Sequence, residues 1–207
     1  MAPSWNWKTS FLAEVARRVR AEARDVLNVA KLRQAFPELH IGRHSIVSID
    51  DVAGLTCHGL VHIGPFCEIV IEHRSAYTPI AGKLILGHHV TIGSFANIRA
   101  GGGVICLGDD VLLAQKVSII AANHMLGHGS PYREGPWDTH KTGVLIEPNA
   151  WIGAGATILP GCSIGTNSVV AAGSVVTRSI PSNELWAGIP ARFVRAISKS
   201  LCAIPNM

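Results

Sequence analysis

Aromatic and charged side chains are scarce in this sequence. Phe, Trp and Tyr make up 6% of the 207 residues and Asp, Glu, Lys and Arg only 15%, while hydrophobic residues reach 48% and glycine occurs 21 times. A core poor in rings and rich in small aliphatic residues indicates thin, close-packed layers rather than a helical bundle. The net charge of +4 is mild, and no nucleic-acid-binding motif is present, so we expect no nucleic-acid partner.

Long apolar runs and paired cysteines are missing as well. No stretch approaches the ~20 apolar residues of a membrane-spanning helix, and the N-terminus shows no signal-peptide pattern. The cysteines are odd in number and form no C-x-x-C pair; they are Cys57, Cys67, Cys106, Cys162 and Cys202. We therefore expect reduced, partly buried thiols in a cytoplasmic protein rather than a disulfide framework.

A six-residue repeat is the dominant positive feature of the sequence. Residues 146–181 read as six hexads, IEPNAW IGAGAT ILPGCS IGTNSV VAAGSV VTRSIP, each opening with Ile or Val. This period fits neither a helix nor a long alternating strand. It predicts short strands joined by turns and coiled into a prism, with each opening aliphatic side chain pointing inward. Small residues suit the turns, where glycine relieves the steric limit on φ.

The repeat is interrupted in its centre. Upstream hexads occur at 63–68, 86–97 and 107–124, and His124 closes the last of them. The next hexad starts only at Ile146, so residues 125–145 form an insertion, the only long central interruption that the pattern reveals. We divide the chain into a helical segment 1–39, a β-helix 40–181 and a C-terminal segment 182–207.

The hexads resemble those of the hexapeptide-repeat acyltransferases, and residues 122–161 are similar to the sugar O-acetyltransferase branch. In that branch an N-H or T-H pair precedes a loop and a [KR]-x-G-x-[VI]-x-I-x-x-[ND]-[VA]-W-I-G segment, which Lys141 and Trp151 fit here. The resemblance implies a left-handed parallel β-helix that forms a homotrimer with sites between subunits. It also implies acetyl-CoA as cosubstrate, a carbohydrate acceptor and no metal.

His124 is the candidate general base. A hydroxyl that attacks a thioester must lose its proton, and histidine is the side chain most easily poised to take it near neutral pH. The resemblance places a catalytic histidine here and an acceptor site in the loop. The candidate acceptor-binding residues are Asn97, Asn123, Tyr132 and Trp137. Asn97 reads equally well as a turn residue, and AGGG at 100–103 stands where relatives often carry an acid, which leaves the acceptor open.

The coenzyme contacts are expected downstream of the loop. A narrow groove between coils suits the pantetheine arm, and guanidinium groups suit its phosphates. The residues matched by the resemblance are Trp151, Gly153, Ala154, Ala172, Thr177, Arg178, Arg192 and Arg195. Tight turns and solvated charges remain the alternative interpretations of the small residues and of the arginines.

The two ends of the chain lie outside the repeat. Residues 8–35 form an amphipathic basic pattern that predicts a helix ending before Pro37. We favour a cap over the first coil, while Trp5 and Trp7 keep peripheral membrane contact open. After the last hexad, AGIPARFVR resembles a family segment, and we expect a short C-terminal helix there.

Three other functions compete with sugar acetylation. A trimeric γ-class carbonic anhydrase would use histidines as metal ligands, and His88, His89, His124 and His128 are available, but that family carries them in regular hexads. A serine or antibiotic acetyltransferase would show a D-H-G-T or an aromatic-Pro-aromatic segment, which this chain lacks. The third alternative is a catalytically inactive trimeric scaffold.

Overall fold

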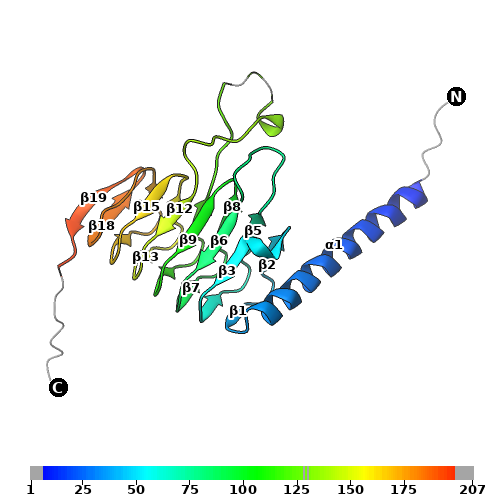
Figure 1. Cartoon of the computed structure of the whole chain (residues 1–207), viewed down its shortest axis with the longest axis horizontal. Helices are drawn as coiled ribbons and strands as arrows, with labels where there is room; N and C mark the ends of the chain where they lie inside the picture. Colours follow the sequence, from blue (N-terminus) through cyan, green and yellow to red (C-terminus); the bar gives the residue numbers. More distant parts are fainter. Residues whose placement is uncertain (1–6, 128, 130, 199–207) are drawn as a thin grey trace.

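The computed structural model describes residues 7–127, 129 and 131–198. Three sheets form the sides of a prism (Figure 1). Sheet A contains β1 (Leu39–Ile41), β4 (Val61–Ile63), β7 (Val90–Ile92), β10 (Leu112–Leu113), β13 (Trp151–Ile152), β16 (Val169–Val170), β18 (Glu184–Gly188) and β19 (Ala191–Ala196). Sheet B contains β2 (Ile46–Ile49), β5 (Glu68–Glu72), β8 (Asn97–Gly101), β11 (Ser118–Ile120), β14 (Thr157–Ile158) and β17 (Val175–Val176). Sheet C contains β3 (Leu55–Cys57), β6 (Lys83–Leu86), β9 (Val104–Leu107), β12 (Val144–Ile146) and β15 (Cys162–Ile164).

The predicted parallel β-helix is confirmed. Successive strands of the chain belong to different sheets, and each pairs in parallel with the equivalent strand of the next coil. The residues that open the hexads fill the interior: Ile152, Ile158, Ile164, Val170 and Val176 are all fully buried. Because these side chains stack on their equivalents one coil away, the prism has one continuous aliphatic core and needs few aromatic rings.

The N-terminal helix covers the first coil only with its last turns. In α1 (Trp7–Ala35), Leu32 is fully buried, and the Arg33 guanidinium donates to the Ile41 carbonyl at 3.3 Å. Farther out, the helix runs away from the β-helix (Figure 1), and Phe11, Val19 and Val26 are exposed. The predicted cap is therefore corrected to these last turns, since the rest of α1 has no neighbouring surface in the described residues. Trp5, invoked for membrane contact, lies outside them, and none of the described helices is long and apolar enough to cross a membrane.

The expected short C-terminal helix is wrong for residues 182–198. β18 instead pairs in parallel with β16, and β19 folds back antiparallel on β18. Gly188, with φ of 102°, provides the left-handed turn between the two strands. Adding β18 satisfies the backbone groups that β16 would otherwise leave open, so the sheet edge overrides the local helical pattern. Residues 199–207 lie outside the described part of the chain.

A second loop, which the hexad pattern does not reveal, joins β5 to β6. It contains residues 73–82 and lies beside the predicted insertion 125–145, and both loops leave the β-helix on the same side (Figure 1). The backbone N–H of Trp137 in the insertion donates to the Tyr77 carbonyl in the second loop at 3.0 Å. The β-helix therefore has two long loops among the described residues, not the single one that the hexad pattern predicts.

The expected thiols give a prediction for Cys57. The four described cysteines are free, and burial raises the pKa of Cys57 to about 12. Because the thiolate is the reactive form, we expect Cys57 to resist iodoacetamide at pH 8 in the native protein and to react after unfolding in denaturant. Mass spectrometry of the labelled peptides measures both rates. Equal labelling of Cys57 before and after unfolding would contradict the burial argument.

Candidate active site

His124 lies at the base of the insertion, just after β11. Its backbone forms an isolated antiparallel bridge with Trp137, so the loop closes on itself immediately beyond the histidine. The Met125 N–H donates to the Pro136 carbonyl at 2.9 Å, and the Asp138 N–H donates to the Asn123 carbonyl at 2.8 Å. These bonds fix the backbone on both sides of His124 while its side chain stays exposed.

Two cavities meet at His124. The inner one, of about 240 Å³, lies between the outer face of sheet B and the insertion. Its lining residues are Val70, Glu72, Arg99, Gly101, Ile120, Ala122, Asn123, His124 and Trp137. The outer one, of about 730 Å³, is lined by Asn123, His124, Met125, Leu126, Tyr132, Asp138 and His140. His124 and Asn123 belong to both, so a molecule in either cavity can reach the imidazole.

Trp137 forms the wall of the inner cavity. Its ring lies directly over Gly101 and Gly102, where an added Cβ would contact the indole, at 3.0 Å in the case of Gly101. Tyr77 stacks on the ring at 6.2 Å between centroids, and His124 meets it edge-on at 6.1 Å. The glycines of the AGGG segment therefore make room for this tryptophan. The indole thus contacts Tyr77 and His124 and still lines the inner cavity, so its predicted role in acceptor binding stays a prediction.

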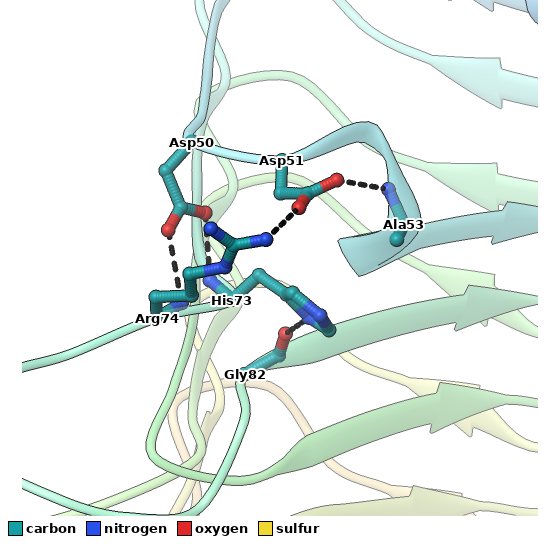
Figure 2. A network of polar contacts seen from close by, with 6 residues as sticks. All are labelled: Asp50, Asp51, Ala53, His73, Arg74 and Gly82. Atoms are coloured by element: carbon teal, nitrogen blue, oxygen red, sulfur yellow. Dashed lines mark hydrogen bonds and ion pairs between the residues drawn. The ribbon is translucent and has the colours of Figure 1, made fainter.

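The second loop is anchored at both ends (Figure 2). The Asp50 carboxylate accepts from the backbone N–H groups of His73 at 2.7 Å and of Arg74 at 2.9 Å. The Arg74 guanidinium pairs with Asp51 at 2.9 Å, and the His73 ring lies 3.2 Å from the Gly82 carbonyl. This network holds the loop that carries Tyr77 against the insertion.

Asp50 gives the anchor a defined dependence on pH. Burial would raise the pKa of Asp50, but the hydrogen bonds from the His73 and Arg74 amides outweigh it and lower the pKa below the ordinary value. A lowered pKa in the folded state means that the stabilisation is present above the ordinary aspartate pKa and is lost as pH falls through the lowered one. We expect Asp50→Ala to accelerate amide hydrogen exchange at His73 and Arg74 at neutral pH. Unchanged exchange in the variant would show that Asp50 does not hold the loop.

The predicted acceptor residues are only partly brought together. Asn123 lines both cavities and Tyr132 the outer one. Asn97 lines neither: its side-chain oxygen accepts from Arg99 Nε at 3.0 Å, and its amide donates to Glu68 at 3.4 Å. Asn97 therefore contacts Arg99, which lines the inner cavity. His128 lies outside the described residues.

Sequence reasoning missed Glu72, Arg99 and Tyr77. Glu72 and Arg99 lie on neighbouring strands of sheet B and line the inner cavity, while Tyr77 supports Trp137. Hexad spacing does not reveal them, because their shared surface exists only once the coils stack. The available signal in the sequence was the charge of Glu72 and Arg99 at positions that face outward from the β-helix.

The predicted coenzyme residues lie away from His124, downstream along the β-helix. Ala154 and Ala172 occupy successive coils at one corner, where the Gly173 N–H donates to the Ala154 carbonyl at 2.8 Å. A Cβ on Gly153 would overlap the backbone of Ala171 and Ala172, so the coils approach closely there. Thr177 follows β17 and is exposed.

The three predicted arginines lie on or against the C-terminal hairpin. The Arg178 guanidinium lies 5.0 Å from the centroid of the Trp186 ring. Arg192 and Arg195 are exposed on β19. Arg192 donates to the Ala191 carbonyl at 3.0 Å and Arg195 to the Ala196 carbonyl at 3.2 Å, and each guanidinium keeps further N–H donors that a phosphate could accept.

Trp151 and His124 are not neighbours along one face of the chain. Trp151 is half exposed on β13 in sheet A, whereas His124 follows β11 in sheet B. Three or more His, Cys, Asp or Glu side chains grouped as metal ligands do not occur within residues 7–127, 129 and 131–198.

Known proteins share this repeat and fold. The family model described as bacterial transferase hexapeptide (six repeats) matches residues 143–178. Galactoside O-acetyltransferase of Escherichia coli is 38% identical over 94 residues, which cover 45% of each chain. Gamma carbonic anhydrase 2 of Arabidopsis thaliana is 30% identical over 168 residues, covering 78% of this chain and 57% of that protein. The matches thus span about half the length of these relatives.

A solved structure supports the fold. The N-acyltransferase AntD from Bacillus cereus, in complex with a dTDP-amino sugar and coenzyme A, superposes with a TM-score of 0.61 at 20% identity. The superposition covers 77% of this chain and 84% of that one. The matched repeat and the parallel β-helix are thus shared with hexapeptide-repeat proteins, and several of the similar proteins are acetyltransferases.

Proposed function

We propose that this protein is an acetyl-CoA-dependent O-acetyltransferase that modifies a carbohydrate hydroxyl, in the synthesis of a surface polysaccharide or an oligosaccharide in the cytoplasm. The observation that carries this proposal is the position of His124, which lines both the inner and the outer cavity. The smaller inner cavity suits the acceptor ring, and the larger outer one leaves access for a thin thioester arm.

The reaction would proceed by direct transfer. The neutral imidazole of His124 takes the proton of the acceptor hydroxyl as its oxygen attacks the thioester carbonyl, and the new C–O bond forms a tetrahedral intermediate. The C–S bond then breaks, and the thiolate of coenzyme A takes the proton from the imidazolium. Backbone N–H groups are suitable donors to the oxyanion. All atoms balance without a metal or an acyl-enzyme.

The residues predicted to bind coenzyme A would come from a second copy of the chain. Within one chain Trp151 and His124 lie on different sheets, so we propose a homotrimer in which the corner with Trp151, Gly153, Ala154 and Ala172 faces the His124 cavity of the neighbour. Thr177, Arg178, Arg192 and Arg195 would then hold the phosphate end of the coenzyme.

The test is thiol release from acetyl-CoA against a panel of sugars, nucleotide-sugars and oligosaccharides. Release that depends on one class of sugar, with mass spectrometry showing one added acetyl group, is the expected result. To test the carbonic anhydrase alternative, the rate of CO₂ hydration and the metal content of the purified protein are measured. Hydration activity with bound zinc and no acetyl transfer would overturn the proposal.

A further inference from the structure

Glu72 is a carboxylate of the inner cavity to which the proposed reaction gives no role. It ends β5 and stands opposite Gly101 of β8, on the same outer face of sheet B as Glu68 and Val70. A Cβ placed on Gly101 would lie 3.1 Å from Glu72 Oε2 and 3.0 Å from the Trp137 ring. The absence of a side chain at Gly101 thus leaves the carboxylate and the indole side by side in the cavity that His124 lines.

The Glu72 carboxylate has unused hydrogen-bonding capacity. Among the residues that the structure describes, no donor side chain or backbone N–H contacts its carboxylate oxygens. Glu68, four residues earlier on the same strand, is by contrast paired with Arg99 at 2.9 Å and with Asn97 at 3.4 Å. The half-buried Glu72 carboxylate can therefore accept hydrogen bonds from donors on a ligand in the cavity.

The size of the cavity limits what that ligand is. Its volume of about 240 Å³ lies below the ~300–1,000 Å³ of pockets that enclose drug-sized ligands. One sugar ring fits this space, while further rings of a longer acceptor would extend into the outer cavity. Adjacent hydroxyls of a ring present two donors at a spacing that one carboxylate accepts.

We propose that Glu72 is an acceptor-binding residue that accepts hydrogen bonds from the hydroxyl next to the reacting one and so directs the reacting hydroxyl toward His124. This assignment rests on the proposed acetyltransferase function and deepens it by selecting a vicinal diol on a single ring. Trp137, seated on Gly101 and Gly102, supplies the apolar wall that holds the ring edge-on to the carboxylate.

The test compares Glu72→Gln and Glu72→Ala with the parent and with Glu38→Gln, which makes the same charge change at an exposed position before β1. Steady-state rates are measured with the best acceptor and with its deoxy analogue that lacks the neighbouring hydroxyl. Coenzyme A affinity is measured separately by calorimetry. We expect Glu72→Ala to lower the acceptor kcat/KM about 10- to 100-fold, the loss of a hydrogen bond to a charged group, with unchanged coenzyme affinity. The deoxy analogue should be equally poor for the parent and for the variant.

Two results would overturn the assignment while leaving the proposed function intact. One is an acceptor kcat/KM that Glu72→Ala leaves unchanged although His124→Ala abolishes transfer. The other is a Glu72→Gln variant in which coenzyme A affinity falls by the same factor as the acceptor kcat/KM. The carboxylate would then stabilise the whole site rather than bind the acceptor. A parent protein that transfers acetyl to no member of the acceptor panel would overturn both the function and this inference.

Discussion

Replacing His124 with alanine is expected to lower the rate of acetyl transfer about 10²–10⁴-fold, the usual contribution of a positioned general base. The side chain is exposed and makes only an edge-on ring contact with Trp137, so its removal leaves the core intact. Binding of coenzyme A should therefore persist, because the predicted coenzyme residues lie in other coils. Thiol release and calorimetric titration with coenzyme A measure the two quantities independently.

His62→Ala is the matched control for this experiment. His62 is also exposed and also stacks on a ring, that of His40 at 4.8 Å, but it lies on sheet A in an early coil. We expect its turnover to match the parent. If His124→Ala transfers acetyl at the rate of His62→Ala, His124 is not the general base. The proton of the acceptor hydroxyl must then pass to another group or to water.

The second large effect is expected from Gly82→Ala. Gly82 closes the second loop and donates its N–H to the Glu72 carbonyl at 3.1 Å. A Cβ at this position would overlap the backbone oxygens of Ala100 and Glu72, and backbone, unlike the end of a flexible side chain, moves only with its strand. Overpacking of this kind costs about 1–3 kcal/mol. Denaturant unfolding should report a loss in that range, together with a raised KM for the acceptor, because β5 carries Glu72.

Gly127→Ala separates steric overlap from backbone strain. Gly127 has φ of 75° and nothing within 4 Å of an added Cβ, so alanine there costs only the left-handed conformation, about 1–2 kcal/mol. Its acceptor KM is expected to stay below that of Gly82→Ala. A Gly82→Ala protein with the stability and KM of the parent would mean that β5 and β8 separate freely, which their paired register opposes.

The sequence was sufficient for the parts of the fold that repeat. Each hexad carries its own signal for an inward aliphatic residue and a turn, and the coils add without long-range information. The same logic located His124, because a broken period marks where a loop leaves the prism. The insertion was therefore predicted, and its closure next to His124 by the bridge to Trp137 is consistent with the expected role.

The remaining features depend on contacts between coils, which a period does not encode. The loop 73–82 follows a hexad that is itself irregular, so no break in phase is visible there. Trp137 was predicted as a candidate acceptor-binding residue, but its position over Gly101 and Gly102 could not be predicted, because only the paired strands bring these glycines into place. The C-terminal residues were predicted to be helical from local pattern, and the open edge of sheet A turned them into strands.

The antiparallel strand β19 also changes the sheet edge that the last coil presents to another molecule. A parallel β-helix grows by adding coils of one polarity, so an open last coil is a template for the first coil of another molecule and hence for a filament. β19 reverses the polarity of the final edge of sheet A, and it places Arg192 and Arg195 on that edge, where charge opposes strand pairing between molecules. At the other end, the last turns of α1 lie over β1 and β2. Arg192 and Arg195 thus place positive charge on the edge strand, and exchanging both for alanine would be expected to lower solubility as well as coenzyme affinity.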